Sequence, residues 1–179
     1  MTGPRHIRNI ALVGFMGTGK SSVARLLASQ LRFAVLDTDE MIERQSGKTI
    51  AEIFSSEGEP AFRKYEAQVV AELAARDRTI IATGGGVGAN PAHLDSLKQH
   101  ALVVCLWASP EKIWERVREH GHRPLLQGPD PQAKIRELLA AREPIYKQAD
   151  VLLNTQVRSV KEVAQQVMHQ FRQARSESP

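Results

Sequence analysis

The chain has 179 residues, enough for one domain with a full hydrophobic core and too few for two domains of ordinary size. Its hydrophobic content of 42% and charged content of 25% are ordinary for a globular protein, and no apolar run approaches the roughly 20 residues that span a bilayer. The net charge of +4 comes without a lysine or arginine run or interleaved aromatic residues, so small anionic ligands explain it as well as nucleic acid does.

The lone Cys105 cannot form an internal disulfide, which suits a reducing compartment. Residues 1–9 are polar and lack the apolar stretch of a secretory signal. Apart from His120 and His122, the histidines are scattered, and neither they nor the cysteine indicate a metal site. We therefore expect a single cytoplasmic domain over 1–179, monomeric, with no membrane segment and no nucleic-acid partner.

Residues 14–22, Gly-Phe-Met-Gly-Thr-Gly-Lys-Ser-Ser, match the phosphate-loop pattern Gly-x-x-x-x-Gly-Lys-[Ser/Thr]. The apolar run 10–13 before them predicts a strand, and apolar residues spaced by three and four after them predict a helix. Lys20 is expected to reach the β- and γ-phosphates of a nucleotide, and the Ser21 hydroxyl to ligate Mg²⁺. The residues expected to bind the nucleotide here are Gly17, Thr18, Gly19, Lys20, Ser21 and Ser22. The alternative, a glycine-rich turn without function, does not account for the flanking strand and helix.

A second strand is predicted at 33–36, followed by Asp37-Thr38-Asp39 and a helical stretch at 40–44. In an open α/β sheet, ligands bind at the carboxyl ends of the strands, on the side where the phosphate loop lies. Asp37 and Asp39 are therefore candidate functional carboxylates. The alternative is that this segment only caps the following helix.

The stretch 49–76 has a helical pattern that is interrupted near Gly58 and Pro60. Its second part carries one face formed by Phe62, Glu66, Val69, Val70 and Leu73. Arg63 lies at the border of this face. Its side chain either points toward a cleft or lies along the surface with its head in water.

A third, fully apolar strand is predicted at 79–82, and it runs into the glycine triplet 84–86. Three consecutive glycines leave backbone N–H groups open to a ligand, although a tight turn is the alternative. No aspartate ends this strand, as one does beside Mg²⁺ in many phosphate-loop enzymes. Asp37 is the natural substitute.

A fourth strand is predicted at 101–107, and Ser109-Pro110 opens a helix that carries Arg116. The segment 120–131 is too rich in glycine and proline for a helix interior. We expect either a passive connector or a mobile lid that carries Arg123 and excludes water from phosphoryl transfer.

In the following helix, Arg142 continues the apolar spacing of Ile135, Leu138 and Leu139, and Glu143-Pro144 is expected to end the run. A charge that points inward needs an anionic partner. A fifth strand at 151–153 and a last helix from about Val160 complete the pattern, with 173–179 frayed.

Alternating strands and helices behind a phosphate loop predict a three-layer α/β/α kinase domain with a parallel sheet of about five strands and a mobile lid. The motifs, taken together and in order, resemble the shikimate kinases over nearly the whole chain. They are the phosphate loop at 14–22, Asp-Thr-Asp at 37–39, Phe-Arg at 62–63, Gly-Gly-Gly at 84–86, Arg-Pro-Leu-Leu at 123–126, and Arg142 before Pro144.

This resemblance implies transfer of the γ-phosphoryl group of ATP to the 3-hydroxyl of shikimate, with Mg²⁺, in aromatic amino-acid biosynthesis through chorismate. The residues that match shikimate ligands are Asp39, Arg63, Gly85 and Arg142. The lid arginine matches Arg123, and the carboxylate near Mg²⁺ matches Asp37. Lys20, Asp39 and Arg123 are thereby implied in catalysis, and Arg116 and Arg158 in contacts near the nucleotide base. Where some members have a proline against the adenine, this chain has Ser159 or Val160.

Two other classes share part of the pattern. A kinase for gluconate or a nucleoside monophosphate would share the phosphate loop and a lid, but a monophosphate kinase is expected to carry more lid arginines than Arg123 alone. A nucleotide-dependent switch or nucleic-acid motor would need a guanine-reading Asn-Lys-x-Asp motif or added DNA-binding elements, and the sequence contains neither.

Overall fold

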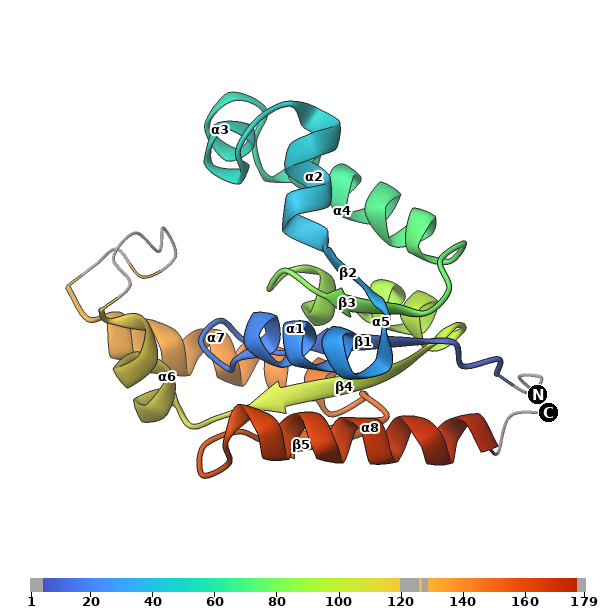
Figure 1. Ribbon diagram of the computed structural model, residues 1–179. Coiled ribbons are helices and arrows are strands. Elements are labelled where there is room, and N and C mark those ends of the chain that lie inside the picture. Colours follow the sequence, from blue (N-terminus) through green and yellow to red (C-terminus); the bar gives the residue numbers. More distant parts are fainter. Residues whose placement is uncertain (1–4, 120–125, 127–128, 177–179) are drawn as a thin grey trace.

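The computed structural model describes residues 5–119, 126 and 129–176, and its centre is a five-stranded sheet (Figure 1). All neighbouring strands pair in parallel, in the order β2-β3-β1-β4-β5. The strands are β1 (Asn9–Val13), β2 (Ala34–Asp37), β3 (Thr79–Ala82), β4 (Ala101–Trp107) and β5 (Val151–Asn154). The predicted parallel sheet of five strands is confirmed.

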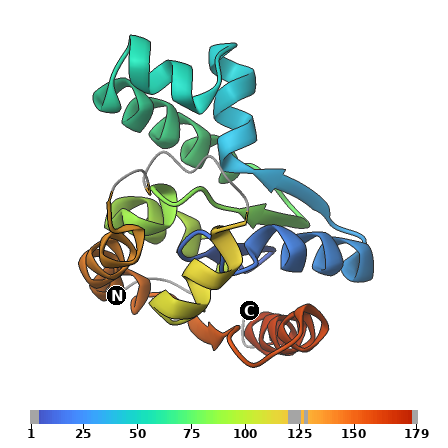
Figure 2. The ribbon, with the colours of Figure 1, turned by 90° about the vertical axis from the view of Figure 1, so that its left-hand side faces the viewer.

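Helices cover both faces of the sheet, so the domain has three layers. The helices are α1 (Lys20–Leu31), α2 (Thr38–Ser46), α3 (Ile50–Ser56), α4 (Glu59–Leu73), α5 (Pro91–Lys98), α6 (Pro110–Val117), α7 (Pro131–Tyr146) and α8 (Val160–Ser176), with a 3₁₀ turn η1 at Val87–Ala89. Figure 2 shows α1 and α8 on one face and α5 and α7 on the other. None of the described helices is both long and apolar enough to cross a bilayer.

The apolar character of the strands on both faces explains why the sheet is buried between the helix layers. Leu12 of β1 packs in one buried cluster with Leu27 of α1 and Val167 of α8. Its neighbour Val13 belongs to the cluster on the opposite face, with Ile113 of α6. Successive strand residues point to opposite faces, so a continuous apolar run fills two cores at once.

Helices α2, α3 and α4 form a lobe that projects beyond β2 (Figure 1). The turn between α2 and α3 is set by Thr49, whose side chain accepts from the backbone of Glu52 while the Glu52 side chain accepts from the backbone of Thr49. This reciprocal capping fixes where α3 begins. The lobe carries Arg63 on α4.

Two predicted helix ends differ from the structure. Pro144 does not end α7, which continues to Tyr146. The proline removes only one N–H donor, and the backbone N–H of Lys147 still bonds the carbonyl of Glu143 at 3.0 Å. The last helix reaches Ser176 rather than fraying at 173, and Phe171, one of its buried residues, anchors this end.

Candidate active site

The phosphate loop joins β1 to α1, as predicted, and its glycines are required by the backbone. Gly14 has φ of 133° and Gly17 has φ of 76°, both in the region that favours glycine. A Cβ atom at Gly14 would also run into the carbonyl oxygen of Leu106 on β4. The loop is thus pressed against the neighbouring strand at the carboxyl edge of the sheet.

Lys20 lies against the backbone of its own loop. Its Nζ donates to the carbonyl oxygens of Gly14 at 2.7 Å and Phe15 at 2.8 Å. Phosphate oxygens are acceptors of the same kind with more negative charge, so a nucleotide can compete for this ammonium group. Ser21 and Ser22 are exposed in the first turn of α1, where backbone N–H groups lack helical partners.

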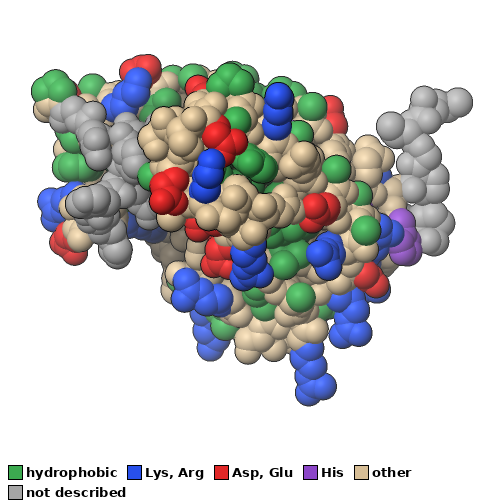
Figure 3. All heavy atoms as spheres, turned by 90° about the horizontal axis from the view of Figure 1, so that it is seen from above, with side chains coloured by type: hydrophobic (Ala, Val, Ile, Leu, Met, Phe, Trp, Pro, Cys, Tyr) green, Lys and Arg blue, Asp and Glu red, His purple; other side chains and the backbone are tan. Residues whose placement is uncertain are grey.

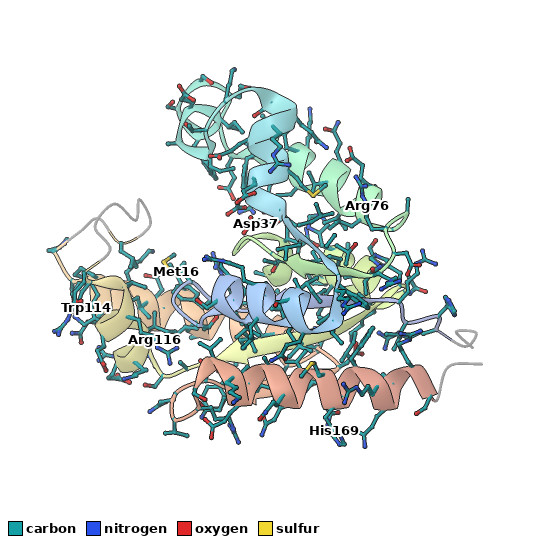
Figure 4. All side chains as sticks on the ribbon, viewed as in Figure 1. Met16, Asp37, Arg76, Trp114, Arg116 and His169 are labelled. Carbon is teal, nitrogen blue, oxygen red and sulfur yellow. The ribbon has the colours of Figure 1, made fainter. Side chains whose placement is uncertain are left out.

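Asp37 caps α2, as the capping alternative for this segment expects. Its Oδ1 accepts from the backbone N–H groups of Asp39 at 2.9 Å and Glu40 at 3.4 Å. Its other oxygen, Oδ2, takes part in neither bond. Figure 4 shows Asp37 where β2 enters α2, above the loop that carries Met16, with Arg76 toward the other end of the sheet. The cap therefore does not exclude a second role at the phosphate loop.

Asp39, two residues farther on, has an altered acidity. Burial, together with the nearby carboxylates of Asp37 and Glu66, raises its pKa from 3.8 to about 6, although Lys20 opposes the shift. A carboxylate with this pKa is a stronger proton acceptor than an ordinary aspartate and is still mostly ionised at neutral pH. Asp39 therefore has the properties of a general base.

The first glycine of the triplet makes room for Asp39. The Gly84 N–H donates to Thr38 Oγ1 at 2.7 Å, which ties the end of β3 to the start of α2. A Cβ atom at Gly84 would overlap the carboxylate of Asp39. The backbone after β3 thus approaches Asp39 as closely as a residue without a side chain permits.

Gly85 and Gly86, the other two glycines of the triplet, lie close to arginine side chains. A Cβ atom at Gly85 would come within 3.1 Å of Arg142 Nη1. A Cβ atom at Gly86 would overlap Arg63 Nη1 and Glu66 Oε1. The triplet therefore brings Asp39, Arg142 and Arg63 around one stretch of bare backbone, an arrangement that a tight turn alone does not require.

Arg63 is held between two carboxylates. Its Nη1 donates to Glu66 Oε2 at 2.7 Å, and its Nη2 donates to Glu59 Oε1, also at 2.7 Å. The Glu66 side chain is 0% exposed and that of Arg63 is 43% exposed. Glu66 Oε1 has no hydrogen-bond partner among the described residues, and burial raises the pKa of Glu66 although Arg63 opposes the shift. Arg63 therefore has features of both predicted orientations, because one guanidinium nitrogen bonds the buried Glu66 while the side chain as a whole stays exposed.

Glu59 and Glu66 were not predicted as site residues. Glu66 was recognisable in the sequence, because an acid in the middle of an apolar helix face needs a cation, and Arg63 precedes it by three residues.

Arg142 stacks on an aromatic ring of the phosphate loop. Its guanidinium carbon lies 5.4 Å from the centroid of the Phe15 ring. Burial raises the pKa of Tyr146, one turn farther along α7, and the nearby Arg142 opposes the shift. No carboxylate among the described residues forms an ion pair with Arg142. The anionic partner expected for this arginine is thus absent from the described part of the chain.

Arg116 connects the phosphate loop to the segment after β5. Its Nη1 donates to the Gly17 carbonyl and to Thr155 Oγ1, both at 3.1 Å, and its Nη2 donates to the Thr155 carbonyl at 2.6 Å. Arg158 is exposed and donates to the Asn154 carbonyl at 2.8 Å. Both arginines therefore flank the loop after β5, and Figure 4 shows Arg116 below the phosphate loop.

The predicted lid, 120–131, is described only at Leu126 and 129–131, and Arg123 lies outside the described residues. No group of three or more His, Cys, Asp or Glu side chains suited to a metal occurs among the residues that the structure describes. A magnesium ion bound with a nucleotide takes only one or two protein oxygens and completes its shell with water and phosphates. The Ser21 hydroxyl and the Asp37 carboxylate fit that donor set.

Comparisons with known proteins agree on one family. The family model of shikimate kinase matches residues 16–172. Shikimate kinase of Symbiobacterium thermophilum is 45% identical over 168 residues, which cover 92% of this chain and 97% of the relative. The structure of Acinetobacter baumannii shikimate kinase in complex with shikimate superposes with a TM-score of 0.86 at 39% identity, covering 93% of this chain and 94% of the other. A gluconokinase from Sinorhizobium meliloti shares the fold, with a TM-score of 0.64 at 17% identity over 96% and 95% of the two chains.

Proposed function

Since the chain belongs to the shikimate kinase family, we propose that it transfers the γ-phosphoryl group of ATP to the 3-hydroxyl of shikimate, giving shikimate 3-phosphate for aromatic amino-acid biosynthesis. The observation that supports this most strongly is the meeting of Asp39, Arg63 and Arg142 around the bare backbone of 84–86. A phosphate loop alone would fit many kinases, whereas this set offers a carboxylate for hydroxyl groups and cations for a carboxylate.

Shikimate binding is assigned to Asp39, Arg63, Gly85 and Arg142. The substrate carboxylate supplies the anion that Arg142 needs, and Arg63 is the second cation on the same side of the triplet. The pairs with Glu59 and Glu66 hold the Arg63 guanidinium in a fixed orientation before substrate arrives. Gly85 permits the substrate to approach the backbone closely.

The chemical step follows from the acidity of Asp39. As the 3-hydroxyl oxygen attacks the γ-phosphorus, Asp39 accepts its proton, the bond from phosphorus to the β,γ-bridging oxygen breaks, and ADP leaves. Lys20 stabilises the charge on the β- and γ-phosphates, and the loop N–H groups around Gly17, Thr18 and Gly19 bind them. Ser21 and Asp37 would hold Mg²⁺, which when bound neutralises phosphate charge.

The remaining nucleotide contacts are assigned by position. Ser22 lies in the first turn of α1, and Arg116 and Arg158 flank the loop after β5, where the base of ATP is proposed to lie. Arg123 is proposed to contact the transferring phosphates from a lid over about 120–131.

We also infer that residues 1–179 act as one cytoplasmic kinase domain and as a monomer, with no nucleic-acid or membrane partner. Acidic and basic side chains are interspersed on the face seen in Figure 3, with no broad surface of one sign for a polyanion.

A coupled assay of ADP release tests the proposal, with shikimate, gluconate and AMP offered separately to the full chain and ATP. We expect turnover with shikimate and only background with the other two. Phosphorus NMR of the product should show one phosphomonoester on shikimate. Comparable turnover with gluconate or AMP would contradict the assignment, and so would ADP release without a phosphorylated product.

A further inference from the structure

A cavity of about 470 Å³ lies near the amino-terminal ends of the strands, whereas the phosphate loop lies at their carboxyl ends. Its lining comes from the segments just before β1, β2 and β3 and from the carboxyl ends of α1 and α8. In Figure 1 this is the end of the domain where α8 ends. Because all strands are parallel, their amino-terminal ends lie together. Gly14 and Asp37 lie at the opposite, carboxyl ends of β1 and β2. The cavity is therefore separate from the proposed active site.

Part of the lining is apolar and aromatic. The rings of Phe33 and Phe171 meet edge to face, with centroids 5.8 Å apart, and Ile7 and Leu31 contribute aliphatic surface. Phe171 lies on α8 and is 2% exposed, so its ring is fixed in the buried cluster that also contains Leu27 of α1. This surface suits the ring or alkyl body of a small organic molecule.

The rest of the lining is strongly basic. Four arginines, Arg8, Arg78, Arg172 and Arg175, border the cavity, with Asp77 as its one acidic residue. None of these arginines forms an ion pair with a carboxylate anywhere in 5–119, 126 or 129–176. Arg78, Arg172 and Arg175 are exposed to solvent. Like charges gathered at one hollow repel one another, and an anion bound among them would relieve that repulsion.

Three of these guanidinium groups are oriented by neighbouring groups. Arg8 donates to the carbonyl oxygens of Ala74 at 2.6 Å and Arg76 at 3.1 Å. Arg78 lies 5.7 Å from the Phe33 ring centroid, and Arg175 lies 5.6 Å from that of Phe171. Stacking on a ring leaves the edge of a guanidinium, with its N–H donors, available to an acceptor.

We propose that this cavity binds a small organic anion that combines a carboxylate with an aromatic or apolar ring. The arginines supply donors for the carboxylate, and the phenylalanine surface supplies contacts for the ring. Inorganic phosphate would satisfy only the charges, and a neutral ring only the apolar part. Because the arginines and the phenylalanine surface line the same cavity, a molecule with both a carboxylate and a ring should bind more tightly than one with only a charge or only a ring.

Isothermal titration calorimetry with three probes tests the site. The probes are 3-phenylpropanoate, which has ring and charge, 3-phenylpropanamide, which has the ring alone, and inorganic phosphate, which has charge alone. Saturating shikimate and ADP are kept in the cell, so that the proposed carboxylate contacts of Arg63 and Arg142 and the phosphate loop are already filled. We expect 3-phenylpropanoate to bind at one site and each of the other probes to bind at least roughly tenfold more weakly, the scale of losing one charged hydrogen bond.

The double variant Arg172→Gln with Arg175→Gln should weaken 3-phenylpropanoate binding by roughly tenfold or more. Lys161→Gln, which removes an exposed charge near the other end of α8, is the matched control and should leave the affinity unchanged. Both variants should keep the phosphorylation rate of the parent without probe, which shows that they fold. Equal affinity for the acid and the amide, equal affinity in the two variants, or no binding at all would overturn the proposal.

Discussion

Gly84 and Asp39 are fitted to each other, because the carboxylate of Asp39 occupies the space that any side chain at position 84 would need. The contact joins the carboxyl end of β3 to the first turn of α2, and the bond from Gly84 N–H to Thr38 Oγ1 closes it from the other side. The burial that raises the pKa of Asp39 to about 6 depends on this close fit.

The first prediction concerns Gly84→Ala. The new methyl group would displace the Asp39 carboxylate from its place against the backbone, and a shift of about 1 Å at a catalytic group can cost about a hundredfold in rate. We expect kcat to fall by roughly that factor in a steady-state assay, with a native circular dichroism spectrum. Gly85→Ala is the comparison, because its methyl group would meet Arg142 Nη1, and it should raise the KM for shikimate more than it lowers kcat. Equal effects of both changes on kcat and KM would contradict the assignment.

A second prediction concerns pH. Asp39 must be ionised to accept a proton, and its pKa in the free protein is about 6. The value of kcat/KM should therefore rise tenfold per pH unit below about 6 and level off above it. Asp39→Asn should lose roughly two to four orders of magnitude of kcat and this acidic limb of the profile. A wild-type profile that is flat down to pH 4.5 would argue against Asp39 as the base.

The third prediction concerns the effect of the Asp39 carboxylate on the free energy of unfolding. Because folding raises the pKa of Asp39 from 3.8 to about 6, the folded state binds the proton more tightly than the unfolded state does. The ionised carboxylate therefore destabilises the fold, with no effect below pH about 4 and the full effect above pH about 6. Asp39→Asn should raise the free energy of unfolding by about 3 kcal/mol at pH 7.5 and by little at pH 3.5, at 1.36 kcal/mol per pKa unit. Urea titrations at the two pH values measure this, and an equal gain at both would show that the raised pKa is not its cause.

The fourth prediction concerns Lys20→Ala. The Lys20 ammonium group donates to the backbone carbonyls of Gly14 and Phe15 in its own loop, and Lys20 is not a member of either buried apolar cluster. Removal should lower kcat by at least roughly two to three orders of magnitude, the scale of losing one preorganised charge donor, with an unchanged melting temperature. Lys161→Gln, an exposed change on α8, is a suitable control. Turnover near that of the parent would refute the role of the loop in phosphoryl transfer.

The fifth prediction separates the two arginines beside the triplet. Arg142→Ala and Arg63→Ala should each weaken shikimate binding much more than ATP binding in separate titrations, because both lie beside 84–86 rather than in the phosphate loop. Arg63→Ala should also destabilise the fold by roughly 3 kcal/mol, since it leaves Glu66 buried without its cation. Adding Glu66→Gln to that variant should restore part of the stability but not the shikimate affinity. Full recovery of affinity in the double variant would mean that Arg63 only neutralises Glu66.

Much of this architecture could be predicted because its signals are local. The apolar runs at 10–13, 79–82 and 101–107 become strands, and Ser109 caps α6 as its position before Pro110 predicts. The order of the strands could not be read in this way, because pairing joins residues far apart in the chain and apolar runs look alike.

The candidate site was only partly predictable for a similar reason. Asp37, Arg63 and the triplet 84–86 follow recognisable signals at the ends of strands or on a helix face. The partners of these residues are set by tertiary contacts. Phe15 under Arg142 depends on how α7 packs against the phosphate loop, and the link from Arg116 to Thr155 joins segments 39 residues apart in sequence. Glu66 is the exception, because it follows Arg63 by three residues on α4. The local rule predicts a helix end at Pro144, because it ignores that a single missing N–H donor is tolerable in the last turn of α7.

The strand order also bears on how the polypeptide is made. β1 is the first strand to leave the ribosome, yet its two neighbours are β3 and β4, with Ile10 opposite Ile80 on one side and Leu102 on the other. During synthesis one hydrogen-bonding edge of this apolar strand lacks its final partner until residue 82 has been made, and the other edge lacks its partner until residue 107 has been made. Such edges are where nascent chains aggregate, and closing loops of this length slows folding. The central position of β1, which carries the phosphate loop, thus makes the folding of the N-terminal part of the chain dependent on residues that are synthesised later.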